Sequence, residues 1–419
     1  MKLFFRKTTV YAACFCLVLT GCVTNQGGSG TGAAGGPGVG PQTSSLFGRT
    51  AQKVVVDETK PKLDIIVPVF DPGLTKTAEE YKEEGVWPEL RRAEANRFAV
   101  KMKEALEATG AFGAVRVTPD RTATGDLYVL GKILESDGED VEIQIQVTDI
   151  TGDNWFTRTF EHEVDAGFHR NPRNEGKDPY DPVFAEAANR IVLELDDYAS
   201  TDLARLQKIT ELRFGASFTE DAFSEHLDSN GRTIQLVSFP SEADPMLART
   251  RAVRVRDQLF VDGLQDHYQS FSDEMETSYL LWQEQSLLEQ EARAAANEKA
   301  AGQAALGVLA IGLGVLAAIA GGRSGNVGGR TAGTTGAIAG GVIGAKLLTE
   351  SFQTSEEAKV HREALDELGQ SIDIEMAPRV VAFEKETVQL TGDAREQFAQ
   401  WRAFLQEIFE QERTPAVQL

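Results

Sequence analysis

The sequence has almost no cysteine, little histidine and a deficit of basic residues. All three cysteines lie within the first 22 residues, which excludes a disulfide scaffold, a zinc ribbon and a cysteine nucleophile in the folded body. No two of the five histidines have the spacing of a zinc site; they are His162, His169, His226, His267 and His361. Lysine and arginine number 42 against 64 acidic residues, for a net charge of −22. Such acidity argues against nucleic acid as a partner, because DNA binding requires basic neutralisation.

The sequence also lacks the short motifs of common catalytic sites. Residues Gly215–Thr219 approach a Gly-x-Ser-x-Gly nucleophile elbow but lack its second glycine, and no phosphate-binding Gly-x4-Gly-Lys-Ser/Thr is present. The acidic turns Asp137–Asp140 and Asp149–Asp153 do not follow the spacing of an EF-hand. We therefore predict that the protein is not an enzyme and has no catalytic, cofactor-binding or metal-binding residues. A lipid-anchored hydrolase acting through His169 or Asp178 stays open as an alternative.

What the chain does contain is a targeting signal at its N-terminus. Lys2, Arg6 and Lys7 precede an apolar run, Val10–Leu19, which is the pattern of a secretory signal peptide and is too short for a stable membrane span. The run ends in Leu19-Thr20-Gly21-Cys22. This sequence resembles the lipobox of bacterial lipoproteins at every position.

The resemblance to bacterial lipoproteins implies both processing and destination. It implies cleavage after Gly21, a diacylglycerol on the Cys22 thiol and an N-acyl chain such as palmitate, which together suffice for stable anchoring. Residues 1–21 would then be the signal peptide, and residues 22–60 a lipidated, Gly-rich flexible linker. Val23, rather than Asp, follows the cysteine, which by the same resemblance favours the outer membrane with the body facing the periplasm. The alternative is a soluble secreted protein in which Cys22 is incidental.

Residues 61–200 have the pattern of a small periplasmic α/β domain. Alternation of apolar and polar residues predicts strands, and apolar residues on one helical face predict helices. The expected strands are Leu63–Phe70, Ala114–Thr118, Asp126–Glu135, Val141–Asp149 and Phe156–Val164, and the expected helices are Pro88–Thr109 and Pro182–Tyr198. This order predicts an α+β fold, with helices on one face of a mainly antiparallel sheet.

A turn and a loop stand out within this domain. The segment Val147–Trp155 contains Asp-x-Thr-Gly before a tryptophan. It resembles a hairpin turn of the α/β domains of curli-secretion lipoproteins, TolB N-terminal domains and lipoprotein activators of penicillin-binding proteins, although Trp155 comes one residue early. The polar loop Phe168–Asp181 is a candidate contact surface, or else a simple connection between a strand and a helix.

The second half of the chain has a helical pattern. Residues 201–299 are predicted to form a helical region, with a helix over Thr201–Leu212, a strand over Thr233–Phe239 and a long helix that begins at Asp244-Pro245. Residues 349–419 are predicted to form C-terminal helices, the last from Asp393 to about Gln411, which pack on that long helix.

Between them, residues 300–348 are expected to form an apolar glycine-zipper hairpin. Ala300–Gly322 and Thr331–Ala345 contain no charged residue, and small residues four apart let two helices approach closely. The predicted helix-packing residues are Gly314, Ala318, Gly322, Gly336, Gly340 and Gly344. Two interpretations stay open: a transmembrane or oligomerising helical hairpin, and a hairpin buried in a soluble helical bundle.

Together these features predict a non-enzymatic outer-membrane lipoprotein that acts in envelope assembly or secretion. Its expected partners are the membrane, envelope proteins and copies of itself. The alternative is a tethered periplasmic regulator of a cell-wall enzyme, in which the Gly-rich linker gives the body its reach.

Overall fold

The computed structural model describes residues 57–75, 77, 80–81, 86–218, 223–229, 231–320, 356–383 and 386–411. Within these ranges the side chains of residues 293, 295–320, 356–358, 383 and 411 are not described. Cys22 and the residues 321–348 of the predicted hairpin lie outside the described residues.

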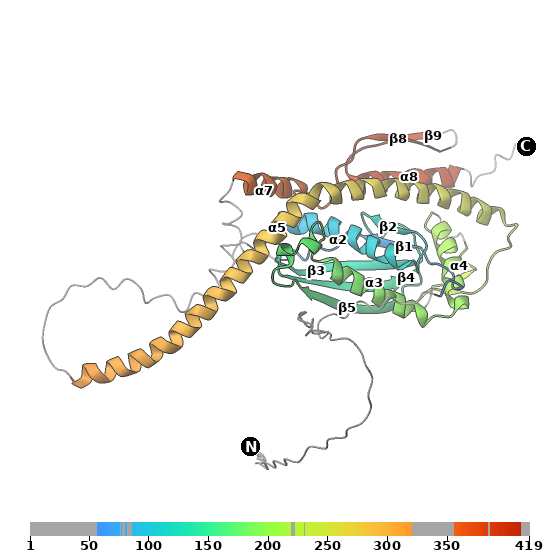
Figure 1. Ribbon diagram of the computed structural model, residues 1–419. Coiled ribbons are helices and arrows are strands. Elements are labelled where there is room, and N and C mark those ends of the chain that lie inside the picture. Colours follow the sequence, from blue (N-terminus) through green and yellow to red (C-terminus); the bar gives the residue numbers. More distant parts are fainter. Residues whose placement is uncertain are drawn as a thin grey trace, which may run out of the picture. The chain divides into compact units, whose positions relative to one another are not determined.

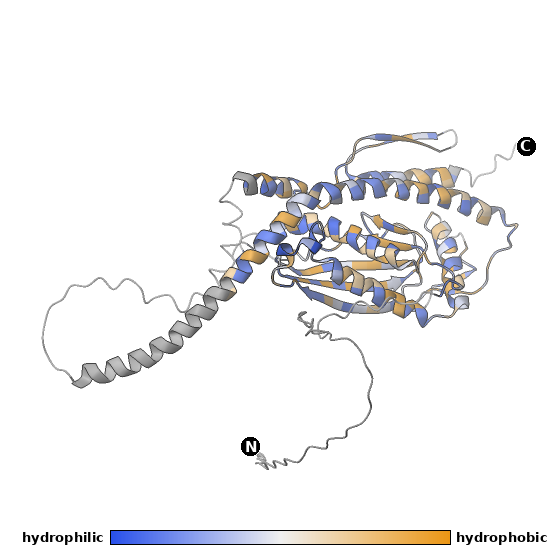
Figure 2. Ribbon diagram, viewed as in Figure 1, coloured by the Kyte–Doolittle hydropathy of each residue, from blue (hydrophilic) through white to orange (hydrophobic). Residues whose placement is uncertain are grey.

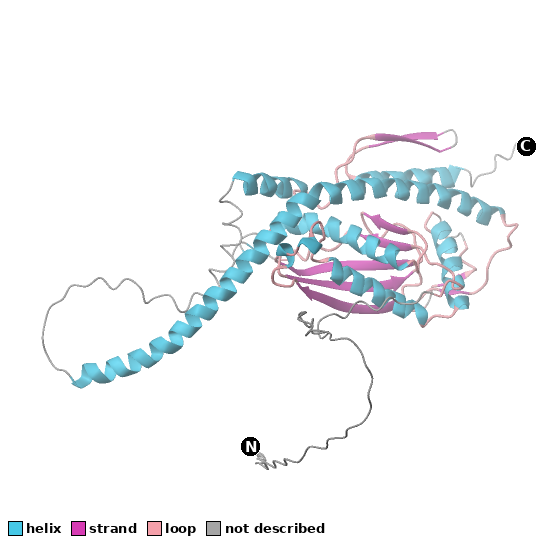
Figure 3. Cartoon of the chain, in the orientation of Figure 1, coloured by secondary structure: helices cyan, strands magenta, loops and turns pink. Residues whose placement is uncertain are grey.

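The described residues combine a five-stranded sheet, two small hairpins and six α-helices (Figures 1 and 3). The strands are β1 (Ile65–Pro68), β2 (Val115–Thr118), β3 (Leu127–Ser136), β4 (Asp140–Asp149), β5 (Asn154–Glu163), β6 (Leu227–Asp228), β7 (Gln235–Leu236), β8 (Arg379–Phe383) and β9 (Glu386–Leu390). The helices are α2 (Pro88–Thr109), α3 (Asp181–Asp196), α4 (Ser200–Ala216), α5 (Pro245–Ala320), α7 (Glu356–Leu368) and α8 (Ala394–Gln411).

The main sheet has the order β2-β1-β3-β4-β5. β1 pairs in parallel with both β2 and β3, whereas β3, β4 and β5 pair antiparallel. The sheet is therefore mixed, with two of its four pairings parallel. Most paired residues belong to the antiparallel strands β3, β4 and β5, in line with the prediction, whereas the parallel pairings of β1 were not predicted. The parallel pairing of β1 with β2 has a simple cause, since α2 connects them and carries the chain back to the end of the sheet at which β1 began.

Helix α2 forms where the sequence predicts it. Pro88 occupies its first turn, where the missing N–H removes no helical hydrogen bond, and Gly110 ends it with φ 71°. The helix is buried on nearly every side because it lies between the sheet and α5 (Figure 1). This sandwiched position brings charged residues such as Glu94 and Arg97 into the interior.

The predicted helices on one face of the sheet are confirmed. α2 and α3 lie side by side on that face, above the buried residues of β4, which are Val141, Ile143, Ile145 and Val147. The intervening residues Glu142, Gln144 and Gln146 are only half-buried. This alternation of hydrophobic and hydrophilic residues along the strands can be followed in Figure 2.

The later helices share their core with the sheet. One continuous hydrophobic core includes residues of the sheet, α2 and α3 as well as Leu206 of α4, Phe260 of α5 and Trp401 of α8. As predicted, α8 packs on α5, and the rings of Trp401 and Phe260 stack with centroids 4.9 Å apart. The body from residue 61 onward is therefore not divided at residue 200 by a separate core.

Two features of the second half were not anticipated in full. The predicted strand Thr233–Phe239 is shortened to β7, which pairs with β6, and the hairpin of β8 and β9 was not predicted. The start of α5 agrees with the prediction, because the Asp244 carboxylate accepts hydrogen bonds from the backbone N–H groups of Met246 (2.7 Å) and Leu247 (3.2 Å).

Helix α5 reaches from this core to Ala320, so the first segment of the predicted hairpin is helical as far as that residue. Gly314 and Ala318 therefore belong to α5, while Gly322, Gly336, Gly340 and Gly344 lie outside the described residues. In the part of the chain that is described, no helix has both the length and the apolar character that crossing a membrane requires.

Candidate functional site

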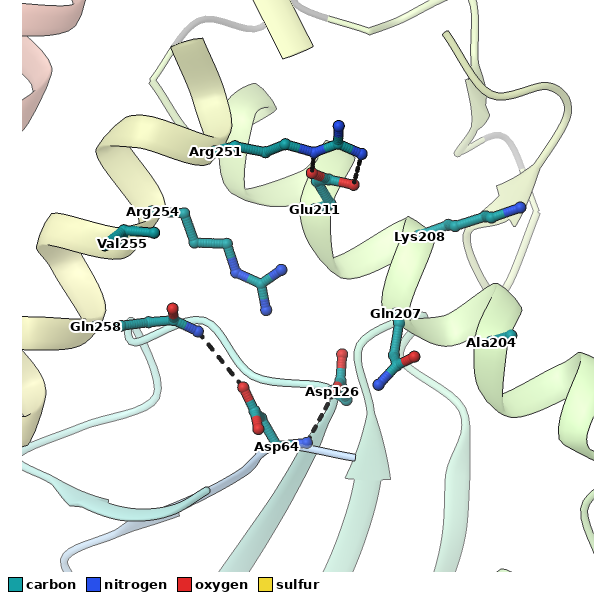
Figure 4. A pocket seen from close by; sticks show the side chains of 10 residues that line it. All are labelled: Asp64, Asp126, Ala204, Gln207, Lys208, Glu211, Arg251, Arg254, Val255 and Gln258. Carbon is teal, nitrogen blue, oxygen red and sulfur yellow. Dashed lines mark hydrogen bonds and ion pairs between the residues drawn. The ribbon is translucent and has the colours of Figure 1, made fainter. Parts of the chain in front are cut away.

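A polar cavity of about 620 Å³ opens between α4, α5 and the sheet. Its floor is made by residues that directly precede β1 and β3, and its two walls are successive turns of α4 and α5 (Figure 4). The lining residues are Asp64, Asp126, Ala204, Gln207, Lys208, Glu211, Arg251, Arg254, Val255 and Gln258. Three acidic and three basic side chains thus face one space.

The two carboxylates of the floor are held by hydrogen bonds from the protein itself. Asp126 accepts from the backbone N–H of Asp64 (2.8 Å) and from the Thr210 hydroxyl (2.6 Å). Asp64 accepts from the backbone N–H of Ala114 (3.0 Å) and from the Gln258 amide (3.4 Å). Burial raises the pKa of Asp126, although the bond from Thr210 opposes that shift. Both carboxylates therefore tie strand ends together rather than standing open.

Arg254 differs from the other charged groups of the cavity. Figure 4 shows its side chain extending from α5 into the centre of the cavity, above Asp64 and Asp126. Its Nε is buried and has no hydrogen-bond partner, and no ion pair joins its guanidinium to any residue that the structure describes. Arg251, one turn earlier, is instead paired with Glu211 and Glu242. The group of the cavity that still has an unused hydrogen-bond donor is thus a cation, Arg254.

A second polar cluster lies in the interior between α2 and α5. Arg97 is fully buried and donates to Asp178 (2.8 Å) and Glu276 (2.5 Å). Its guanidinium also lies over the ring of Tyr279, 4.8 Å from the centroid. The Arg97 guanidinium holds the pKa of the Asp178 carboxyl below its usual value despite burial. This cluster joins α2, α5 and the loop before α3, so its role is to hold α5 on the body.

Glu94 belongs to the same interior cluster and is less well compensated. One of its carboxylate oxygens accepts from the Ser136 hydroxyl (2.6 Å) and the Tyr279 hydroxyl (2.9 Å). The other has no hydrogen-bond partner, and the nearest cation is the Nε of Arg91 at 3.6 Å. Burial, the dominant cause, raises the pKa of Glu94 above its ordinary value.

This raised pKa predicts a pH dependence of stability. A carboxyl whose pKa is higher in the folded state stabilises the fold fully below its unfolded pKa, near 4.5, and that contribution is lost as the pH rises through the folded value. Glu94→Gln stays neutral and keeps an acceptor oxygen. We therefore expect the difference in free energy of unfolding between Glu94→Gln and the parent protein to grow in favour of the variant as the pH rises. Denaturant titrations of both proteins at several pH values from about 4.5 to 8 measure that difference; a difference constant across the range would contradict the assignment.

The loop Phe168–Asp181, predicted as a contact surface or a simple connection, makes contacts within the chain. Asp178 reaches Arg97, and Arg170 pairs with Glu291 of α5 at 2.9 Å. His169 stacks edge-on against Phe168, and burial lowers its pKa. Asp178 is thus held by Arg97, and the charges of Glu284 and Asp178 only partly oppose the effect of burial on the His169 pKa.

The predicted turn between β4 and β5 is confirmed as a hairpin turn. The Asp149 carboxylate accepts from the backbone N–H of Thr151 (2.8 Å) and from the Trp155 indole (3.1 Å), and Trp155 stacks on Tyr198 with centroids 4.3 Å apart. The Asp149 carboxylate thus bonds within the hairpin. Across the described residues, no group of three or more His, Cys, Asp or Glu side chains is placed to hold a metal ion.

Comparison with known proteins gives a uniform result. No protein-family model, curated protein or solved structure matches the chain. The likeness of the turn at Val147–Trp155 to the α/β domains of periplasmic protein families therefore stays an observation on a short sequence.

The cavity itself was not predicted. Asp64, Asp126 and Arg254 are far apart in the sequence and meet only when α5 packs across the ends of β1 and β3. Arg97 does have a local signal in the sequence, since it lies four residues after Ala93 in the expected helix, on its apolar side.

Proposed function

We propose that the protein is a non-enzymatic lipoprotein of the outer membrane, anchored through acyl chains on Cys22, with its body in the periplasm. Its role would be in envelope assembly or secretion. The sequence Leu19-Thr20-Gly21-Cys22 and the uncharged Gly-rich linker support the anchor. The α/β body would serve as the protein-interaction module.

The observation that carries the assembly role is the length and continuity of α5. Its 76 residues correspond to about 114 Å at 1.5 Å per residue. Its early turns belong to the core, and among described side chains Glu291 marks its last ion pair with the body. The same helix then continues to Ala320 and includes the uncharged residues from 300 onward. A helix of this kind fixes the apolar segment to the body rather than leaving it on a loose connection.

The apolar segment would act as the assembly element. In this proposal Ala300–Ala345 forms a helical hairpin whose stripes of small residues pack against each other or against other copies. Gly314, Ala318 and Gly322 make one stripe, and Gly336, Gly340 and Gly344 make the other. Chains joined through this hairpin would present several α/β bodies together.

Mass photometry of the full-length protein in mild detergent tests the assembly role. We expect a discrete oligomer that collapses to monomers when Ala300–Ala345 is deleted. The double variant Gly314→Leu/Gly340→Leu should have the same effect because it fills both stripes, whereas Gly312→Leu/Gly341→Leu adds the same volume off the stripes and should leave the oligomer intact.

Monomers in every case would reject the assembly role and leave the tethered regulator. Equal collapse in both double variants would show that added bulk, not the stripes, disrupts the oligomer. Membrane anchoring is measured separately: Cys22→Ala should move the protein out of the membrane fraction, and retention there would reject the lipid anchor.

A further inference from the structure

We propose that the cavity between α4, α5 and the strand ends is a binding site for a monovalent carboxylate, held by the guanidinium of Arg254. This inference is independent of the proposed assembly role, since the cavity lies in the globular body and involves none of the hairpin residues.

Most charged groups of the cavity already have partners within the protein. Both oxygens of Asp126 and both oxygens of Asp64 accept hydrogen bonds from the protein. Arg251 is bound by Glu211 and Glu242. Of the cavity's charged groups in the described structure, Arg254 combines a central position with a buried, unpartnered Nε. A buried donor without an acceptor is costly, so the cavity is complementary to a ligand that supplies acceptors.

The geometry of a guanidinium selects the class of ligand. Its N–H groups form a planar fork that matches the two oxygens of a carboxylate, giving a bidentate, charge-assisted pair. The surrounding Asp64, Asp126 and Glu211 make a doubly charged phosphate less suitable, because each added negative charge is repelled by three carboxylates. Burial raises the pKa of Asp126, which lessens this repulsion for a single negative charge.

The remaining lining suits a group attached to the carboxylate. Gln207 and Lys208 of α4 and Val255 of α5 line the cavity around Arg254, and Lys208 is 5.4 Å from the centre of the Phe239 ring. A volume of about 620 Å³ accommodates a few residues of peptide as well as a small free acid. Both kinds of ligand would bind through a carboxylate, which belongs either to the C-terminus of a peptide or to a free small acid.

Isothermal titration calorimetry of the full-length protein in mild detergent tests the site. The probes are tri-alanine, tri-alanine amide and N-acetylalanine. We expect tri-alanine to bind and its amide to bind at least about tenfold more weakly, because the amide cannot form the charge-assisted pair. Equal binding of N-acetylalanine and tri-alanine would assign a free acid, and preference for tri-alanine would assign a peptide C-terminus.

Variants of α5 separate this site from general charge effects. Arg254→Gln should weaken tri-alanine binding about tenfold to a hundredfold. It should lower the melting temperature only slightly, since Arg254 makes no hydrogen bond or ion pair with the described residues and contributes only its charge near Asp126 and Asp257. Arg254→Lys keeps the charge but not the fork and should also bind weakly, whereas Arg256→Gln, at an exposed position of the same helix, should bind as the parent does. Unchanged binding in Arg254→Gln, stronger binding of inorganic phosphate than of tri-alanine, or no binding of any probe at about 10 mM would overturn the proposal.

Discussion

Replacing Arg97 by methionine is expected to lower the free energy of unfolding by about 3–5 kcal/mol. Arg97 has no exposed surface and pairs with Asp178 and Glu276. Methionine fills much of the same volume but leaves the Asp178 carboxylate, itself 2% exposed, without its closest cation. Lys101, whose Nζ is 3.9 Å from Asp178, compensates only in part because it also pairs with Asp181 at 3.1 Å.

Guanidinium denaturation of matched variants distinguishes this cause from a general loss of charge. Arg121→Met removes a cation at an exposed position and should change stability by less than about 0.5 kcal/mol. Adding Asp178→Leu to Arg97→Met should recover part of the loss, since an ion pair replaced as a whole costs less than one broken by removing a single partner. A loss below about 1 kcal/mol for Arg97→Met would show that the cluster does not hold α5 on the body.

The elements that could be predicted are those with local signals. Helix α2 was predicted with its observed bounds, because Pro88 and Gly110 mark its two ends through backbone chemistry alone. Asp244 likewise marks the start of α5 by hydrogen-bonding to nearby N–H groups. In β4 the strict alternation of Val141 to Val147 with polar residues is a consequence of having one buried face.

The features that escaped prediction depend on contacts between distant residues. The parallel pairing of β1 with β3 joins Ile65 to Leu127. The residues of either strand do not indicate whether the two strands pair parallel or antiparallel. Strand β8 has consecutive apolar residues and exposes Val380, so it lacks the alternation that reveals a half-buried strand. Strand β9 alternates only over Thr387–Leu390, which is too short a stretch to predict a strand. The cavity requires Arg254 to meet Asp64 across a long stretch of chain, and side-chain convergence of that kind is a property of the packed structure.

Trp401→Ala is the second variant with a large expected effect, about 3–5 kcal/mol of destabilisation. The Trp401 ring is 2% exposed and stacks on Phe260, and its indole N–H donates to Asp257 at 3.2 Å. Removing it leaves a cavity at the interface of α8 with α5 and also takes a donor from a carboxylate that is 3% exposed. Burial already raises the pKa of Asp257, so this carboxylate is poorly placed to lose a partner.

Two further variants divide the expected loss between packing and hydrogen bonding. Trp401→Phe keeps most of the ring but not the donor, and should cost about 1–3 kcal/mol. Gln406→Ala, on the exposed face of α8, should be nearly neutral. Hydrogen exchange supplies a readout specific to the interface. In Trp401→Ala the amides of α8 should exchange faster, while the amides of β4 should exchange as slowly as in the parent protein. The reason is that α8 packs against a core that the sheet and α2 already form. Equal acceleration throughout the body would show instead that α8 and the sheet unfold only as one unit.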